Sequence, residues 1–122
     1  MRKTIIAALA SVFTAAAATA AFAHAELETA VPAANATVKE APKTIEIDFS
    51  EELNPKLSKI EVQDSMGMTM DKGDSHVSDS DAKHMSVDLQ SLSAGTYKVL
   101  WTSVASDDGH KLTGTYTFTV QP

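Results

Sequence analysis

The chain of 122 residues is long enough for one small domain, and its 43% apolar content is typical of a globular protein rather than a disordered one. It contains no cysteine, which excludes disulfide scaffolds, thiol catalysis, zinc ribbons and copper sites built on thiolate. The formal net charge of -6 disfavours binding to the phosphate backbone of nucleic acids and favours cations as partners.

The chain begins with the pattern of a secretory signal peptide. Arg2 and Lys3 precede an uncharged stretch, residues 4–23, that ends in small residues. An uncleaved membrane anchor is the alternative, but alanine makes up half of this stretch and dilutes its apolarity. We expect cleavage after Ala23, although two other small-residue triplets nearby also fit a peptidase. Residues 1–23 would then be the signal peptide and residues 24–122 the exported, periplasmic domain.

Short segments that alternate apolar and polar residues fill most of residues 24–122. This period of two is the pattern of β-strands that place one face in a core. The expected strands lie near Leu27 and over residues 45–49, 59–62, 85–89, 97–101 and 112–120, and residues 33–40 are expected to form an irregular connection. About seven strands in one domain predict an all-β fold, either an immunoglobulin-like or another Greek-key β-sandwich.

A polar segment, residues 64–83, interrupts the alternation and predicts a long loop with at most one short strand. It contains Met66, Met68 and Met70, followed by His76. Thioether sulfur is a soft ligand that selects Cu(I), and it survives in an oxidising compartment where thiolates do not. On an extended loop the three methionines would line one face and form a Cu(I) site. The alternative is a strand whose methionines fill the core.

An acidic motif that ends in histidine, residues 106–110, precedes the last expected strand. Asp108 and His110 are two residues apart, so on an extended segment their side chains leave the same face and can converge on one ion. If His24 is the first residue of the processed chain, its amine and imidazole can chelate that ion too. Three nitrogens and one oxygen in a tetragonal plane suit Cu(II). The alternative for this motif is a polar hairpin turn with an exposed histidine.

Motifs for catalysis are weak by comparison. Ser103 and Ser106 lie near Asp108 and His110 in the sequence, but no glycine-rich nucleophile elbow accompanies them, which disfavours a hydrolase. The small size and the 6% aromatic content disfavour a carbohydrate cleft, and glycine-rich phosphate loops are absent from the sequence. We therefore expect a protein that is not an enzyme.

The residues described above resemble the CopC family of periplasmic copper-resistance proteins. The resemblance covers the whole of residues 24–122 and is carried by His24-Ala25, Pro32, residues 45–51, residues 94–101, residues 106–110, and Gly114 ahead of Phe118. It implies a seven-stranded Greek-key β-sandwich or barrel, cupredoxin- or immunoglobulin-like, that binds copper without being an enzyme.

The resemblance also implies a ligand set. Cu(II) would be held by the amine and imidazole of His24, the carboxylate of Asp108 and the imidazole of His110, with Glu51 as a weak ligand or an outer neighbour. A second, Cu(I) site in some members lies in a methionine-rich loop with one histidine, which corresponds here to Met66 through His76. The methionines of this chain are packed more closely together than in the resembling loops.

These observations predict a monomeric periplasmic copper carrier for copper resistance or homeostasis, not embedded in the membrane once processed. Its expected partners are the copper ion and either a membrane copper transporter or another periplasmic copper protein. Because copper must displace protons from amine and imidazole, binding should weaken from about pH 7 to about pH 5. Two alternatives are a histidine-brace copper oxidase of the polysaccharide monooxygenase type and a metal-free β-sandwich interaction module whose histidines are incidental.

Overall fold

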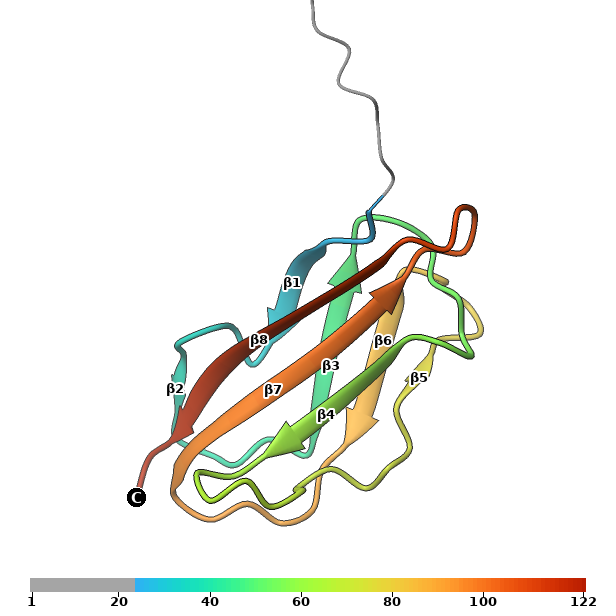
Figure 1. The fold of residues 1–122 in the computed structure, drawn as a ribbon. Coiled ribbons are helices and arrows are strands. Elements are labelled where there is room, and N and C mark those ends of the chain that lie inside the picture. Colours follow the sequence, from blue (N-terminus) through green and yellow to red (C-terminus); the bar gives the residue numbers. More distant parts are fainter. Residues whose placement is uncertain (1–23) are drawn as a thin grey trace, which may run out of the picture.

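The computed structural model describes residues 24–122, which form two four-stranded β-sheets packed face to face (Figure 1). In chain order the strands are β1 (Leu27–Val31), β2 (Thr37–Val38), β3 (Thr44–Phe49), β4 (Lys59–Gln63), β5 (His76–Val77), β6 (His84–Asp88), β7 (Gly95–Val104) and β8 (Lys111–Val120). Sheet A has the strand order β1-β3-β6-β5, and sheet B has the order β2-β8-β7-β4. The predicted signal peptide, residues 1–23, lies outside the described residues. Among residues 24–122, no helix has the length and apolarity needed to cross a membrane.

The predicted all-β sandwich is confirmed, with eight strands in the described part of the chain instead of about seven. The additional strand is β2, which lies inside residues 33–40, the segment expected to be irregular. It pairs in parallel with the end of β8. β5 is the one short strand expected within residues 64–83. Both strands have only two residues, so no alternation pattern could reveal them.

The core lies between the two sheets and consists of the inward residues of the alternating segments. Met85, in the expected strand over residues 85–89, is 0% exposed and packs in the core. Fully buried side chains of this size each contribute about 1.5–3 kcal/mol to folding. Thr113, Thr115, Thr117 and Thr119 lie on the outer face of β8. The largest core side chains are Phe49, Phe118, Ile45, Ile47, Leu53, Ile60 and Met85.

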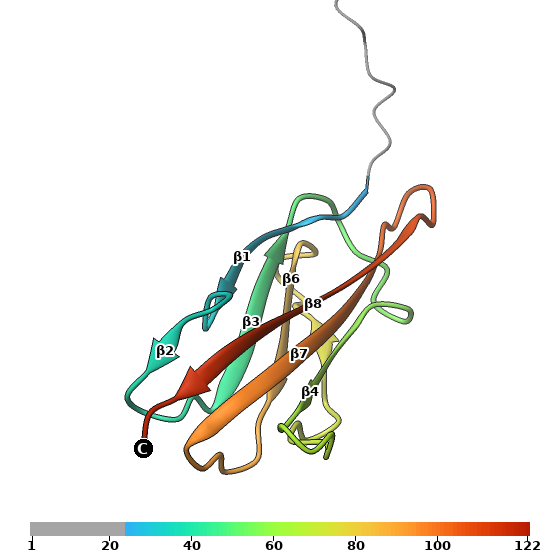
Figure 2. The same cartoon turned by 60° about the vertical axis from the view of Figure 1, so that its left-hand side comes forward.

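The strand pairing brings the N-terminal end of the described chain and the turn between β7 and β8 to the same end of the sandwich. β1 runs antiparallel to β3 with Leu27 opposite Phe49, so the residues before β1 lie beside the end of β3. The hairpin of β7 and β8 turns at the same end, as Figures 1 and 2 both show. The turn that follows β4 lies at the opposite end. A strand rises about 3.3 Å per residue, which places the two ends roughly 20 Å or more apart.

Candidate metal centre

The segment before β1 is fixed to the sandwich by two serine side chains. Ser50, just after β3, donates from Oγ to the His24 carbonyl at 3.0 Å, and the Glu26 N–H donates to the same Oγ at 2.9 Å. Ser103, near the end of β7, donates from Oγ to the Ala25 carbonyl at 2.6 Å. His24 is therefore held beside the ends of β3 and β7.

The motif before β8 forms the polar hairpin turn that the sequence offered as the alternative to an extended segment. The Gly109 N–H donates to the Ala105 carbonyl at 3.0 Å, and Gly109 has a φ of 72°, a left-handed conformation that glycine adopts without strain. The turn still brings the two predicted ligands together. The His110 N–H bonds Asp108 Oδ1 at 3.0 Å, and His110 Nδ1 lies 2.9 Å from Asp108 Oδ2. Asp108 and His110 therefore lie together even though the segment forms a turn and is not extended.

The Asp108 carboxylate is electrostatically stabilised by its neighbour. Its pKa is lowered chiefly by the backbone N–H of His110, and secondly by the His110 side chain. The carboxylate is therefore ionised throughout the neutral range and available as a hard oxygen donor.

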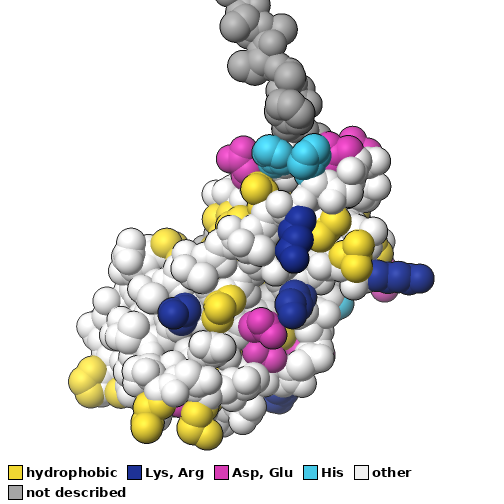
Figure 3. Space-filling view, in the orientation of Figure 1, with side chains coloured by type: hydrophobic (Ala, Val, Ile, Leu, Met, Phe, Trp, Pro, Cys, Tyr) yellow, Lys and Arg dark blue, Asp and Glu magenta, His cyan; other side chains and the backbone are white. Residues whose placement is uncertain are grey.

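The imidazoles of His24 and His110 meet at this end of the sandwich. Their ring centroids lie 4.8 Å apart with an interplanar angle of 70°. Figure 3 shows histidine side chains side by side here, with acidic side chains on both sides. The structure thus brings together His24, Asp108 and His110, the predicted Cu(II) ligands, although His24 is far from the other two in the sequence.

The cluster does not hold three metal-ligating side chains in a ready-made arrangement. Within residues 24–122, no group of three or more His, Asp or Glu side chains has the geometry of a metal site. Asp108 Oδ2 lies 2.9 Å from His110 Nδ1. A metal ion here therefore needs a donor beyond these side chains, such as the amine of His24, or a rotation of the Asp108 carboxylate.

Glu51 lies beside the hairpin turn between β7 and β8. It is half-buried and lines a polar pocket of about 230 Å³ together with Glu52, Lys83, Ser106 and Asp107. The Ser106 N–H donates to the Glu52 carbonyl at 2.9 Å, which ties the hairpin turn to the end of β3. This position suits a residue that lies near the candidate copper ligands without being one of them.

The methionine segment is a tight turn and not the extended loop expected from the sequence. Asp64 Oδ1 accepts hydrogen bonds from the N–H groups of Met66 and Met68, both at 2.9 Å, and Gly67 has a φ of 84°. Met66 is 84% exposed and Met68 is 63% exposed, whereas Met70 packs against the core. The prediction that the three methionines line one face is therefore wrong, because the Asp64 side chain closes the chain into a turn.

His76 begins β5, at the edge of sheet A, while the methionine turn follows β4 of sheet B. Its side chain is exposed, and its Nδ1 lies 3.0 Å from the Asp74 carbonyl. The predicted Cu(I) ligands are thus distributed over two sheets.

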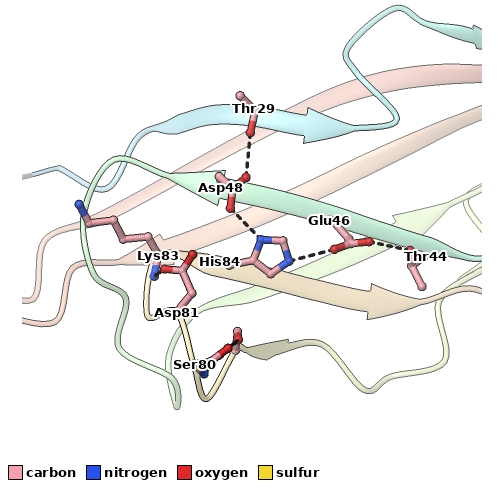
Figure 4. A network of polar contacts seen from close by, with 9 residues as sticks. Thr29, Thr44, Glu46, Asp48, Ser80, Asp81, Lys83 and His84 are labelled. Carbon is pink, nitrogen blue, oxygen red and sulfur yellow. Dashed lines mark hydrogen bonds and ion pairs between the residues drawn. The ribbon is translucent and has the colours of Figure 1, made fainter.

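His84 has a role that the sequence did not reveal. Its Nδ1 lies 2.7 Å from Asp48 Oδ1 and its Nε2 lies 3.0 Å from Glu46 Oε1, on the outer face of sheet A (Figure 4). The pKa of His84 is raised, mainly by the hydrogen bond to Asp48, and the pKa of Asp48 is lowered, mainly by His84. With a carboxylate at each ring nitrogen, His84 links β6 to β3 and is not placed as a metal ligand.

A comparison with known families decides the relationship. The CopC domain family matches residues 27–121. The chain belongs to the CopC family. It is 40% identical to Copper resistance protein C of Escherichia coli over 108 residues, which are 83% of this chain and 84% of that protein.

Solved structures of CopC proteins have the same fold. CopC from Methylosinus trichosporium OB3b superposes with a TM-score of 0.72 and 31% identity, covering 81% of this chain and 95% of that one. PcoC, a methionine-rich copper resistance protein from Escherichia coli, gives a TM-score of 0.71 and 38% identity, covering 81% of this chain and all of the other. The expected cupredoxin-like β-sandwich of this family is thereby confirmed.

Proposed function

We propose that this CopC domain is a periplasmic copper carrier that serves copper resistance or homeostasis and binds Cu(II) where His24 and His110 meet. The observation that carries the proposal is the 4.8 Å contact between the two imidazole rings, with Asp108 bonded to one of them. Relatives named copper resistance protein support copper as the cargo.

The donor set of the proposed site favours Cu(II) over other divalent ions. It consists of the amine and imidazole of His24, the imidazole of His110 and the carboxylate of Asp108. Nitrogen donors with one hard oxygen suit a tetragonal Cu(II) centre, and Cu(II) also binds most tightly in the divalent series. Cleavage after Ala23 supplies the amine, since before processing this nitrogen is part of a peptide bond. Glu51 acts as an outer neighbour.

A second, Cu(I) site is proposed at the methionine turn. Two apolar side chains as exposed as Met66 and Met68 on one short turn are unusual, because burial normally stabilises such groups. Their thioether sulfurs are soft ligands that prefer Cu(I). Met70 and His76, the remaining predicted ligands, both follow this turn in the sequence, but Met70 packs against the core and His76 begins β5 of the other sheet.

The two proposed sites lie at opposite ends of the sandwich, so one molecule does not pass an ion directly between them (Figure 1). We infer that the protein acts as a monomer that exchanges copper with a membrane copper transporter or another periplasmic copper protein. A carboxylate in the copper plane leaves fewer open positions than an oxidase of the histidine-brace type needs, which favours a carrier over an enzyme.

The proposal is tested by titrating the processed protein with Cu(II) against a competing chelator. His110→Ala should weaken Cu(II) binding by at least about tenfold, because one of the four ligands is lost. His76→Ala is the matched control, since it removes an exposed histidine at a distance from the cluster and should leave Cu(II) affinity unchanged. Equal affinities of His110→Ala and the unsubstituted protein would contradict the proposed site.

A further inference from the structure

We infer that Ser103 and Ser50 are positioning residues that fix the backbone of residues 24–26 so that His24 is already in place for Cu(II) before the ion arrives. This inference rests on the proposed function, because it assigns a cause to the affinity of that same site. It concerns side chains that are not themselves ligands.

Ser103 occupies a position where an apolar side chain is expected. β7 points Tyr97, Val99 and Ser103 toward the core, and Ser103 is 0% exposed. A hydroxyl buried without a partner is destabilising, so its partner has structural significance. That partner is the Ala25 carbonyl at 2.6 Å, from a segment distant in the sequence. The polar residue is therefore retained in the core at the point where it can hold the chain next to His24.

Ser50 holds the same segment from the other sheet. Its Oγ donates to the His24 carbonyl at 3.0 Å and accepts from the Glu26 N–H at 2.9 Å, while its own N–H donates to the Glu26 carbonyl at 2.8 Å. Ala25 lies between these contacts with its methyl group 0% exposed. The peptide group before Ala25 is thus bonded to Ser50, just after β3 of sheet A. The peptide group after it is bonded both to Ser50 and to Ser103 of sheet B.

These contacts oppose the usual behaviour of a chain end. Terminal residues generally fray unless hydrogen bonds and burial tie them down. A chelating residue that is free to move must be ordered when the metal binds, and this ordering lowers affinity. Fixing the backbone from His24 to Glu26 leaves only the imidazole and the amine to be oriented, next to His110. The serines therefore raise affinity without contacting the ion.

Ser58 provides a matched control at the same end of β7. It is also buried, 5% exposed, and its Oγ accepts from the Val104 N–H at 3.0 Å and donates to the Val104 carbonyl at 3.4 Å. The hydrogen bonds of its side chain are with Val104 of β7 and not with residues 24–26. Ser58→Ala therefore removes a buried serine hydrogen bond of comparable kind without loosening the segment that carries His24.

The experiment compares Ser103→Ala, Ser50→Ala, Ser50→Thr and Ser58→Ala in the processed protein. Amide hydrogen exchange at Glu26 and Ser50 is measured in the metal-free state, and Cu(II) affinity is measured by chelator competition. Ser103→Ala and Ser50→Ala should each speed exchange and weaken Cu(II) binding by about tenfold, the factor that matches the net loss of one buried hydrogen bond. Ser50→Thr keeps the hydroxyl and should behave as the unsubstituted protein. Ser58→Ala should lower the melting temperature while changing neither readout.

Two outcomes would overturn the inference. One is that Ser103→Ala and Ser58→Ala weaken Cu(II) binding by the same factor, which would mean that only general stability matters. The other is unchanged exchange at Glu26 in both alanine variants. If the unsubstituted protein binds no Cu(II) while the variants still accelerate exchange, the proposed function fails and the positioning of residues 24–26 stands.

Discussion

The imidazole of His24 lies against the imidazole of His110, with 4.8 Å between ring centroids, although the first precedes β1 and the second precedes β8. The pairing of β1 with β3 and the hairpin of β7 and β8 produce this contact. Our account of copper binding depends on it.

Copper release by acid is the first prediction. The pKa of Asp108 is lowered by the hydrogen bonds from His110, so this carboxylate stays ionised well below neutral pH. Imidazoles and amines bind protons between about pH 8 and about pH 5, and protons compete with Cu(II) for the same nitrogens. Cu(II) affinity should therefore fall from about pH 7 to about pH 5, as a chelator-competition series at several pH values would show. Release confined to the region below about pH 4 would implicate carboxylates instead.

The His84 network predicts a pH-dependent contribution to the stability of the metal-free protein. Because the pKa of His84 is raised above its usual 6.5, its contribution is complete below that value and is lost as the pH rises through the raised pKa. Because the pKa of Asp48 is lowered below its usual 3.8, its contribution is present above that value and is lost as the pH falls through the lowered pKa. The network therefore contributes most between these two values.

The test of this network is His84→Ala. It should lower the melting temperature more at pH 5 than at pH 9. The loss in free energy of unfolding at pH 5 should stay below about 1 kcal/mol, because the carboxylates of Glu46 and Asp48 are half-exposed. His76→Ala is the control, since His76 lies outside the network. An equal loss of stability at both pH values for His84→Ala would show that the ring acts through packing alone.

Cu(I) binding should depend on the thioethers of the methionine turn. The double substitution Met66→Leu and Met68→Leu keeps two apolar side chains and removes both exposed sulfurs, so Cu(I) affinity should fall by at least about tenfold. Cu(II) affinity should not change, because the turn is at the other end of the sandwich. Met85→Leu, in the core, is the matched control and should leave Cu(I) binding intact. A double variant with unchanged Cu(I) affinity in a reducing chelator competition would rule out this site.

Gly114 should be intolerant of a side chain. A Cβ at this position of β8 would overlap the Trp101 ring, and that ring itself packs against Phe49 with 5.4 Å between centroids. Gly114→Ala should therefore displace the indole and destabilise the domain by about 1–3 kcal/mol. Thermal unfolding measures the loss, with Thr113→Ala on the outer face of β8 as control. Equal melting temperatures for the two variants would show that the indole moves without strain.

Much of the fold could be predicted because alternation marks the residues that face the core. Ile45, Ile47 and Phe49 of β3 and Met85 of β6 are buried as their spacing indicated. The methionine turn could not be predicted, since its shape depends on one Asp64 side chain that accepts two backbone hydrogen bonds. Local polarity indicated a loop there but not its geometry.

The residues of the candidate site could be named from the sequence, but the residues that hold them in place could not. His24, Asp108 and His110 stood out by residue type and position, whereas Ser50 and Ser103 are common residues whose partners depend on the strand pairing. One signal was present in the sequence, since Ser103 is a polar residue in the inward register of a strand. His84 could not be assigned without knowing that it pairs with Asp48 across β3 and β6.

The most direct test of the account is Cu(II) binding by the processed protein with and without an acetyl group on the amine of His24. Acetylation removes one proposed nitrogen donor and its chelate ring while leaving the imidazoles, Asp108 and the fold in place. We predict that mass spectrometry finds His24 at the mature N-terminus and that the acetylated protein binds Cu(II) at least about a hundredfold more weakly. Equal Cu(II) affinity of the acetylated and unmodified proteins would contradict the central claim.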